Sequence, residues 1–334
     1  MTKPTVTVLT LGGTIAMTRS DRGGVVPTLT GEMLVAAVPA LTELAAIDAR
    51  SFRQVPGAHL RFDDLEALAA AVEEAVAGGA RGVVITQGTD TIEETAFALD
   101  RLLDLAAPVV VTGAMRNPTV PGADGPANLL AAVQVATSEA ARGLGCLVVL
   151  NDEIHAARFL RKTHTSSPAA FTSPQAGPIG WVAEGRVQLA ARVERVPALP
   201  RSHKAGEARV ALITVALGDD GRLVDAARQA GFDGMVVEAT GGGHVATAVA
   251  DALERAATAM PVVLASRTGA GETLARTYGF PGGEIDLQRR GLIRAGWLDG
   301  LKAKLLLTLL LRRGQAGRDE VSAAFRPWGG GVET

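Results

Sequence analysis

The chain has 334 residues, of which 47% are hydrophobic and 20% charged, a composition typical of a globular protein large enough for two domains. Its formal net charge of −2 and its scattered basic residues exclude the electrostatic footprint of a nucleic-acid-binding protein. The single cysteine excludes an intramolecular disulfide and a thiolate metal cluster, and no apolar run reaches the length of a membrane span. The first residues lead directly into a strand without a secretory signal, so we expect a cytoplasmic protein with no membrane partner.

Short apolar strands alternate with helical segments through the first part of the chain. Thr91 and Glu94 form a T-x-x-E pattern, which predicts a capping box at the start of one of these helices. The alternation predicts right-handed βαβ units and a parallel sheet covered on both faces. In chain order, we expect a strand at 6–10, a helix at 62–77, a strand at 82–86, a helix at about 91–105, a strand at 109–112, a helix at about 127–141 and a strand at 147–150.

A second α/β series follows a stretch that is rich in proline. We expect a linker at residues 191–208, between a larger N-terminal domain at 1–190 and a smaller C-terminal domain at 209–334. The fold class is therefore α/β with two domains, each with a mainly parallel β-sheet flanked by helices. The second series comprises strands at 210–215, 234–237 and 262–265 and helices around 223–230 and 246–257.

Two threonine-bearing segments follow apolar strands and carry hydroxyl groups to the carboxyl edge of the predicted sheet. The first contains Thr14 and the second contains Thr89. Open α/β sheets bind their ligands at this edge, and a hydroxyl there needs a base before it can act as a nucleophile. Asp90 supplies a carboxylate beside Thr89, and Lys162 follows a strand that ends at the same edge. These four residues form the candidate catalytic set.

A purely structural interpretation of this set stays open at this point. Thr14 and Thr89 are also suited to capping helices, and Lys162 is also suited to a solvated surface. The glycines of both segments, among them Gly13 and Gly88, favour a site, because they let the backbone approach a ligand closely.

The remaining motifs give little support for a cofactor or a metal. The five histidines show no metal-ligand spacing, and the Gly-Gly-Thr segment lacks the G-x-G-x-x-G spacing of a dinucleotide site. We therefore expect neither a metal nor a cofactor. The glycines at 241–243, ahead of His244, suit either a phosphate cradle or, as we favour, a loop at a domain interface.

Several motifs give the chain a resemblance to a known family. They are Leu11-Gly12-Gly13-Thr14-Ile15-Ala16, Thr86-Gln87-Gly88-Thr89-Asp90-Thr91-Ile92-Glu93-Glu94-Thr95 and Thr112-Gly113-Ala114-Met115-Arg116, followed at matching spacings by Ala123-Asp124-Gly125-Pro126, Asn151-Asp152 and Lys162. On these residues the chain resembles, over essentially its whole length, the bacterial-type L-asparaginases of the asparaginase/glutaminase amidohydrolase family.

The resemblance implies hydrolysis of the side-chain amide of L-asparagine to L-aspartate and ammonia. It implies that Thr14 attacks the amide carbon to form an acyl-enzyme, supported by Thr89, Asp90 and Lys162. Which of the two threonines attacks first stays open. The resemblance also implies a homotetramer built as a dimer of dimers.

It further implies a set of substrate-binding positions. Gly88 and Ala114 match residues that line the substrate pocket. Glu284 matches a glutamate that the C-terminal domain of a neighbouring subunit contributes to the site.

Two departures from the family pattern bear on activity. Ala58 and His59 stand in the family's substrate-clamping segment, and Ala58 lacks the hydroxyl that would donate to the substrate α-carboxylate. The lid, at about residues 17–29, contains no tyrosine. We therefore expect weak asparaginase activity with a high KM, a different small amide substrate, or a weakly active amino-acid-binding protein.

Overall fold

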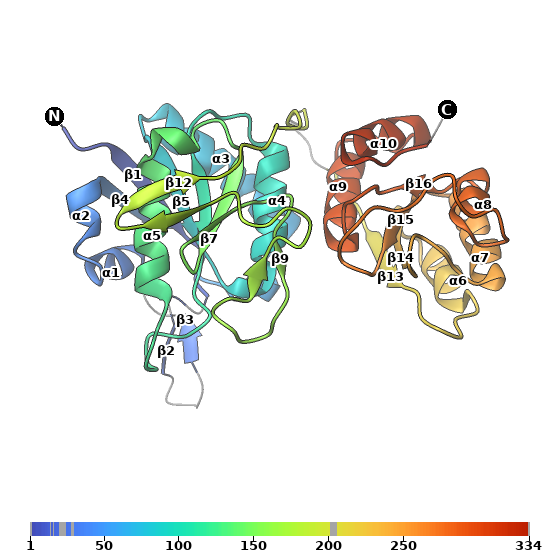
Figure 1. The fold of residues 1–334 in the computed structure, drawn as a ribbon, viewed down its shortest axis with the longest axis horizontal. Helices are drawn as coiled ribbons and strands as arrows, with labels where there is room; N and C mark the ends of the chain where they lie inside the picture. The colour runs from blue at the N-terminus through green and yellow to red at the C-terminus, as the bar shows by residue number, and fades with distance from the viewer. Residues whose placement is uncertain are drawn as a thin grey trace. The chain divides into compact units, whose positions relative to one another are not determined.

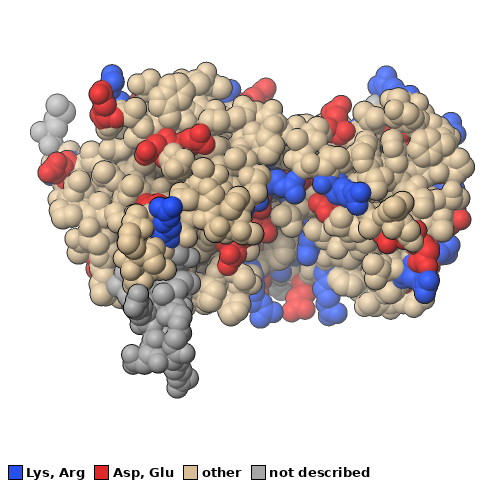
Figure 2. All heavy atoms as spheres, turned by 60° about the horizontal axis from the view of Figure 1, so that its bottom comes forward, with Lys and Arg blue, Asp and Glu red and all other residues tan. Residues whose placement is uncertain are grey.

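The computed structural model describes residues 2–13, 15, 17–19, 25–27, 30–200 and 206–332, the short stretches 17–19 and 25–27 by their backbone alone. The chain divides into two compact units, Met1–Ala198 and Leu199–Thr334. Within the described residues, no helix is long and apolar enough to cross a membrane. On the face of the molecule that Figure 2 presents, acidic and basic side chains are interspersed.

The N-terminal unit is built on a sheet that has eight strands among the described residues (Figure 1), in the order β12-β11-β8-β7-β6-β5-β1-β4. The five strands from β7 to β4 pair in parallel, and β8, β11 and β12 extend the sheet with antiparallel pairs. The strands are β1 (Thr5–Thr10), β4 (Ala46–Ser51), β5 (Gly82–Thr86), β6 (Val109–Thr112), β7 (Cys146–Leu150), β8 (Glu153–Ala156), β11 (Gly180–Ala183) and β12 (Arg186–Leu189). The four strands expected in this unit are confirmed, whereas β4, β8, β11 and β12 were not predicted.

Helices cover both faces of this sheet, as the alternating sequence pattern predicts. Helix α5 packs with α2 over one face, while α3 and α4 pack on the other. The core between α5 and the sheet is made by side chains at alternate strand positions, such as Val6 and Val8 on β1. The helices of this unit are α1 (Gly31–Ala36), α2 (Leu41–Leu44), α3 (Phe62–Ala77), α4 (Ile92–Leu102) and α5 (Gly125–Thr137).

Short elements complete the N-terminal unit. Strands β2 and β3 form one antiparallel pair and β9 and β10 another. They are β2 (Met17–Arg19), β3 (Val25–Pro27), β9 (Arg161–Lys162) and β10 (Phe171–Thr172), with single 3-10 turns η2 (Gly57–His59), η3 (Thr89–Thr91) and η4 (Glu139–Ala141).

The predicted capping box at the start of α4 is wrong. Thr91 occupies the N-cap position, but its side chain makes no capping hydrogen bond. Its hydroxyl instead donates to the backbone oxygen of Gly57, at 2.9 Å. A contact with a distant loop therefore takes the hydroxyl that local sequence assigns to the helix end.

The C-terminal unit carries a smaller, fully parallel sheet of four described strands, in the order β13-β14-β15-β16. Its core includes Val224 of α6 and Val249 of α7, while α9 packs against β13, β14 and β15. Its elements are β13 (Val210–Thr214), α6 (Arg222–Gln229), β14 (Gly234–Ala239), α7 (Thr247–Ala257), β15 (Val262–Ser266), α8 (Glu284–Arg289), β16 (Ile293–Arg294), α9 (Gly300–Arg312), α10 (Arg318–Phe325) and η5 (Arg326–Trp328). The predicted α/β fold with a larger and a smaller sheet unit is confirmed.

His155 on β8 is a buried histidine that we expect to make the N-terminal unit sensitive to acid. Its side chain is 1% exposed, and its Nδ1 lies 2.9 Å from Ser173 Oγ. Burial lowers the pKa of its imidazole from 6.5 to about 4. Between these values the unfolded chain binds more protons than the folded chain, so the free energy of unfolding falls as the pH falls. The stabilisation is fully present above about pH 6.5, and the loss through the window amounts to roughly 3 kcal/mol.

We expect His155→Gln to reduce the acid sensitivity of the fold. Glutamine keeps a polar group near Ser173 but has no proton to gain, so the Tm should fall less between about pH 7 and about pH 4.5 than in the wild type. His59→Gln changes an exposed histidine of the same unit and should leave the wild-type fall unchanged. Calorimetry at several pH values measures both. Equal falls in His155→Gln and the wild type would assign the acid sensitivity to another group.

Candidate active site

The candidate site lies where three neighbouring parallel strands end. In the sheet register, Thr10 of β1 pairs with Thr86 of β5, and Thr86 pairs with Thr112 of β6. The three strands therefore end at the same level, and the segments that follow them meet at one edge of the sheet. Two of those segments carry the threonine motifs, and the third carries Ala114.

Three glycines bring the two threonine segments and the turn η2 into direct backbone contact. Gly13 has φ +87°, and a Cβ on it would lie 2.0 Å from the backbone nitrogen of Gly88. A Cβ on Gly57 would lie 2.8 Å from the backbone oxygen of Gly88. The glycines thus serve close packing of backbone on backbone, which no larger residue permits. Thr14 itself lies outside the described residues, although its neighbour Gly13 is packed against the residue that precedes Thr89.

Lys162, Thr89 and Asp90 come together at this edge. The Nζ of Lys162 donates to Thr89 Oγ1 at 2.9 Å and lies 3.7 Å from Asp90 Oδ1. Thr89 is 6% exposed, the Lys162 side chain 17% and the Asp90 side chain 62%. Lys162 also lies over the ring of Phe171, 5.9 Å from its centroid. The arrangement is a buried threonine hydroxyl that accepts a hydrogen bond from the Lys162 amine, with the exposed carboxylate of Asp90 beside the amine.

This geometry argues against the structural interpretation of Thr89 and Lys162. Lys162 is mostly covered, so it is not a solvated surface lysine. The 3-10 turn η3 has Gly88 at its N-cap and shows no side-chain capping bond. The Thr89 hydroxyl therefore accepts a bond from Lys162 in place of capping.

The turn η2 places Ala58 and His59 beside the threonine segment. Both residues are exposed, and they follow Gly57, whose carbonyl accepts from Thr91. Gly88 packs on the same turn, since a Cβ on it would lie 3.0 Å from the nitrogen of Gly57. The turn that carries Ala58 and His59 is thus held next to the segment that carries Thr89.

A network around Asp124 holds the segment that carries Ala114. The Asp124 carboxylate accepts from the backbone nitrogens of Met115 and Arg116, at 3.0 and 2.8 Å. Asn128 on α5 donates to the backbone oxygen of Gly113 at 2.9 Å. Ala114 is fully buried and belongs to a small apolar cluster. Sequence reasoning missed Asn128, although its place one turn after the Asp-Gly-Pro motif was the available signal.

Glu284 belongs to the C-terminal unit and is not among the residues that the N-terminal unit gathers around Thr89. It is buried, and one oxygen accepts from the backbone nitrogens of Thr277 and Tyr278, at 2.7 and 2.6 Å. The other oxygen lies 3.0 Å from His244 Nε2. Burial acts to raise the pKa of this carboxyl, but the hydrogen bonds from Tyr278, Thr277 and His244 outweigh burial and hold the pKa below its usual value.

The loop at residues 241–243 is held by contacts with residues of the C-terminal unit. The backbone nitrogen of Thr240 donates to the oxygen of His244 at 3.0 Å, and a Cβ on Gly242 would lie 2.7 Å from a Leu274 side-chain carbon. Packing thus accounts for Gly242, and positive φ angles of +51° and +113° account for Gly241 and Gly243. Within the described ranges, no three His, Cys, Asp or Glu side chains gather as a metal site.

A hydroxyl, an amine and a carboxylate gathered at the carboxyl edge of a parallel sheet are the arrangement of groups typical of an α/β enzyme site. Comparison with known proteins narrows this class. The family model described as "Asparaginase, N-terminal" matches residues 5–195, and "Glutaminase/Asparaginase C-terminal domain" matches residues 209–325. The chain therefore belongs to the asparaginase family of amidohydrolases.

Individual relatives agree with this assignment. The chain is 37% identical to a probable L-asparaginase from Deinococcus radiodurans, over 96% of this chain and 97% of that protein. It is 31% identical to a glutamyl-tRNA(Gln) amidotransferase component from Methanosarcina mazei, over 89% of this chain and 74% of that protein. The crystal structure of a probable cytoplasmic L-asparaginase from Campylobacter jejuni matches with a TM-score of 0.87 and 30% identity, over 97% of this chain and 99% of that one.

Proposed function

We propose that the protein hydrolyses the side-chain amide of L-asparagine to L-aspartate and ammonia. The observation that carries this proposal is the contact of Lys162 with Thr89 and Asp90 at the carboxyl edge of the sheet. A catalytic hydroxyl needs a partner that moves its proton, and an amine in contact with it at 2.9 Å is positioned for that role. The probable L-asparaginase of Deinococcus radiodurans, with its full-length match, supports the choice of substrate.

In the proposed reaction a threonine hydroxyl attacks the amide carbon. A bond forms between its oxygen and that carbon, and its proton is relayed through the Thr89 hydroxyl and the Lys162 amine to the leaving nitrogen. The carbon–nitrogen bond breaks, ammonia leaves, and an ester joins the aspartyl group to the enzyme. Water then hydrolyses the ester and restores the hydroxyl. Thr14 is the proposed nucleophile, with Thr89, Asp90 and Lys162 as its supporting group.

Substrate would be held by residues around this set. We assign Gly88, Ala114, Ala58 and His59 to the substrate pocket. We assign Glu284 to the same pocket in a neighbouring subunit, within a homotetramer built as a dimer of dimers. The carboxylate of Glu284, kept ionised by its hydrogen bonds, suits the ammonium group of an amino acid.

The proposal extends to the organisation of the chain and its location. The catalytic domain would comprise residues 1–190 and be joined by a linker at 191–208 to the C-terminal domain at 209–334. The Campylobacter jejuni relative is described as cytoplasmic, which supports the same location for this protein.

A different amide substrate is the alternative that a specific observation favours. The match to an amidotransferase component and the exposed Ala58 and His59 in the turn η2 both allow another amide. Ammonia release with L-asparagine and with L-glutamine separates the two functions. We expect saturable release that is faster with L-asparagine, with a high KM because Ala58 donates no hydrogen bond. Release with L-glutamine alone would favour the alternative, and binding without release would indicate an amino-acid-binding protein.

A further inference from the structure

The 157–162 segment follows β8 and includes β9. It contacts α4 and the turn before α4 through residues near its two ends. At residue 162, the Lys162 ammonium contacts Thr89, in the turn that leads into α4. At residue 158, Arg158 Nη2 donates to Asp100 Oδ2 at 3.2 Å, close to the carboxyl end of α4. The helix rises by about 12 Å between Ile92 and Asp100. Four residues of chain span at most about 14 Å. The two contacts therefore connect the segment to α4 and to the turn before it at two points that are four residues apart.

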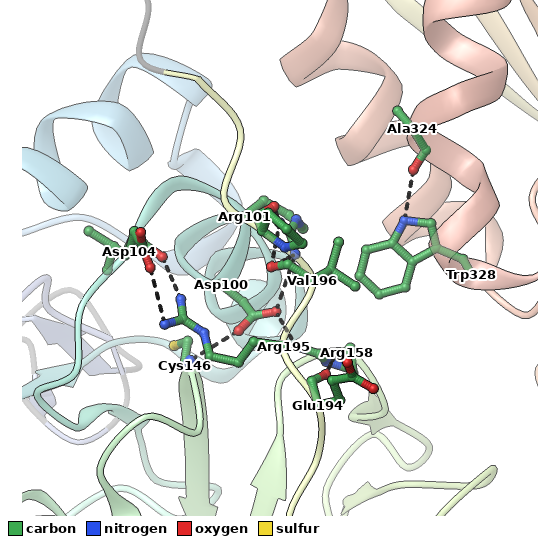
Figure 3. Close-up of polar contacts among 12 residues, drawn as sticks. Asp100, Arg101, Asp104, Cys146, Arg158, Glu194, Arg195, Val196, Ala324 and Trp328 are labelled. Carbon is green, nitrogen blue, oxygen red and sulfur yellow. Dashed lines mark hydrogen bonds and ion pairs between the residues drawn. The ribbon is translucent and has the colours of Figure 1, made fainter.

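The contact at the far end of α4 is built from buried charges (Figure 3). Asp100 is 2% exposed and Arg158 5%. The second oxygen of Asp100 accepts from the backbone nitrogen of Cys146 at 3.2 Å, and Arg158 Nη1 donates to the backbone oxygen of Glu194 at 2.6 Å. Gly145 leaves room for the carboxylate, since a Cβ there would lie 2.2 Å from it. A buried ion pair with its remaining atoms hydrogen-bonded is a rigid anchor.

The other supports of Lys162 are the buried side chain of Leu160 and a short strand pair. Its strand β9 is two residues long and pairs with β10, which is equally short. Lysine is a long and flexible side chain, so the position of its amine depends on where its backbone is fixed. The Arg158–Asp100 pair supplies a fixed point only four residues away.

We propose that Arg158 and Asp100 are positioning residues that set where Lys162 stands relative to Thr89. The inference rests on the proposed function, in which both Lys162 and Thr89 take part in catalysis. In the folded enzyme the ion pair connects the segment to α4, the helix that directly follows the turn carrying Thr89 and Asp90. Its loss lets the amine drift from the hydroxyl, which lowers turnover more than it weakens substrate binding.

The test compares Arg158→Gln with Arg195→Gln. Arg195 belongs to the same cluster and donates to the backbone oxygens of Leu103 and Leu105, at 2.7 and 3.2 Å, but it lies outside the 157–162 segment. We expect Arg158→Gln to lower kcat for L-asparagine by about 10- to 100-fold with KM within about two-fold, because small misplacements of catalytic groups are costly. Arg195→Gln should keep kcat within about two-fold, even at a similar loss of Tm. Equal kcat values for the two variants, measured well below both Tm values, would overturn the inference.

Two additions keep the test decisive. If Arg158→Gln does not fold, Asp100→Asn removes the other charge of the pair and keeps an oxygen for the backbone nitrogen of Cys146, and a kcat unchanged from wild type would equally overturn the inference. Activity of the wild type and its loss in Lys162→Ala test the proposed function separately. If both behave as expected while Arg158→Gln matches Arg195→Gln, the inference alone fails. An inactive wild type, or a fully active Lys162→Ala, would remove the proposed function and the inference with it.

Discussion

Replacing Lys162 by alanine is expected to lower kcat for L-asparagine by about 10²- to 10⁴-fold, the range for losing a group that transfers a proton in the transition state. The Nζ of Lys162 is 2.9 Å from the hydroxyl of Thr89, and alanine leaves that hydroxyl without its donor. KM should change little, because Lys162 contacts the proposed catalytic hydroxyl of Thr89 and is not among the residues proposed to bind the substrate. Steady-state ammonia release measures both constants.

The control for this variant is Lys3→Ala. Lys3 is an exposed lysine of the same unit, and its Nζ donates to the backbone oxygen of Thr42. Its removal should leave kcat unchanged. A Lys162→Ala enzyme with kcat within about ten-fold of the wild type would show that Lys162 merely holds the Thr89 segment in place.

Gly13→Ala is expected to remove activity and to destabilise the N-terminal unit by roughly 3 kcal/mol or more, which is large for a single substitution. An alanine at φ +87° is strained, and its Cβ would lie 2.0 Å from the backbone nitrogen of Gly88. The two threonine segments would have to separate, which would displace the turn that carries Thr89. Thermal unfolding followed by calorimetry, together with ammonia release, measures both effects.

Gly143→Ala is a control that measures how much of the loss of stability in Gly13→Ala comes from backbone strain alone. Gly143 has φ +73°, and a Cβ on it meets nothing within 4 Å. This control should be less stable than the wild type by about 1 to 2 kcal/mol and remain active. If Gly13→Ala unfolds at the same temperature as Gly143→Ala and keeps its kcat, the close packing of Gly13 on Gly88 does not support the site.

The elements that sequence predicts well are those whose signals are local. Helix α3 spans the predicted residues, because its apolar spacing ends at a Gly-Gly pair. Helix α4 ends at Leu102, earlier than predicted, where Leu103 takes an extended backbone. The edge strands β4 and β12 were missed because they are largely exposed or half-buried, so they lack the apolar run that marks a central strand.

The same distinction holds for the candidate site. The position of Thr89 and Asp90 at the sheet edge could be predicted because they closely follow an apolar strand, and parallel strands end at a common edge. The contacts that fix the site were not predictable, because they join residues far apart in the chain. The Thr91 hydroxyl reaches Gly57, and Asp100 pairs with Arg158 across 58 positions. Nothing in the local sequence indicates such a partner.

The most direct test of the account is the formation of both products from L-asparagine by the purified wild-type protein. Ammonia and L-aspartate would be measured in parallel over a wide range of L-asparagine concentrations, with Thr89→Val as the blank. The account predicts that the two products form in equal amounts, that the rate saturates, and that the blank forms almost none. No product above the blank, at concentrations where L-asparagine binds, would contradict it.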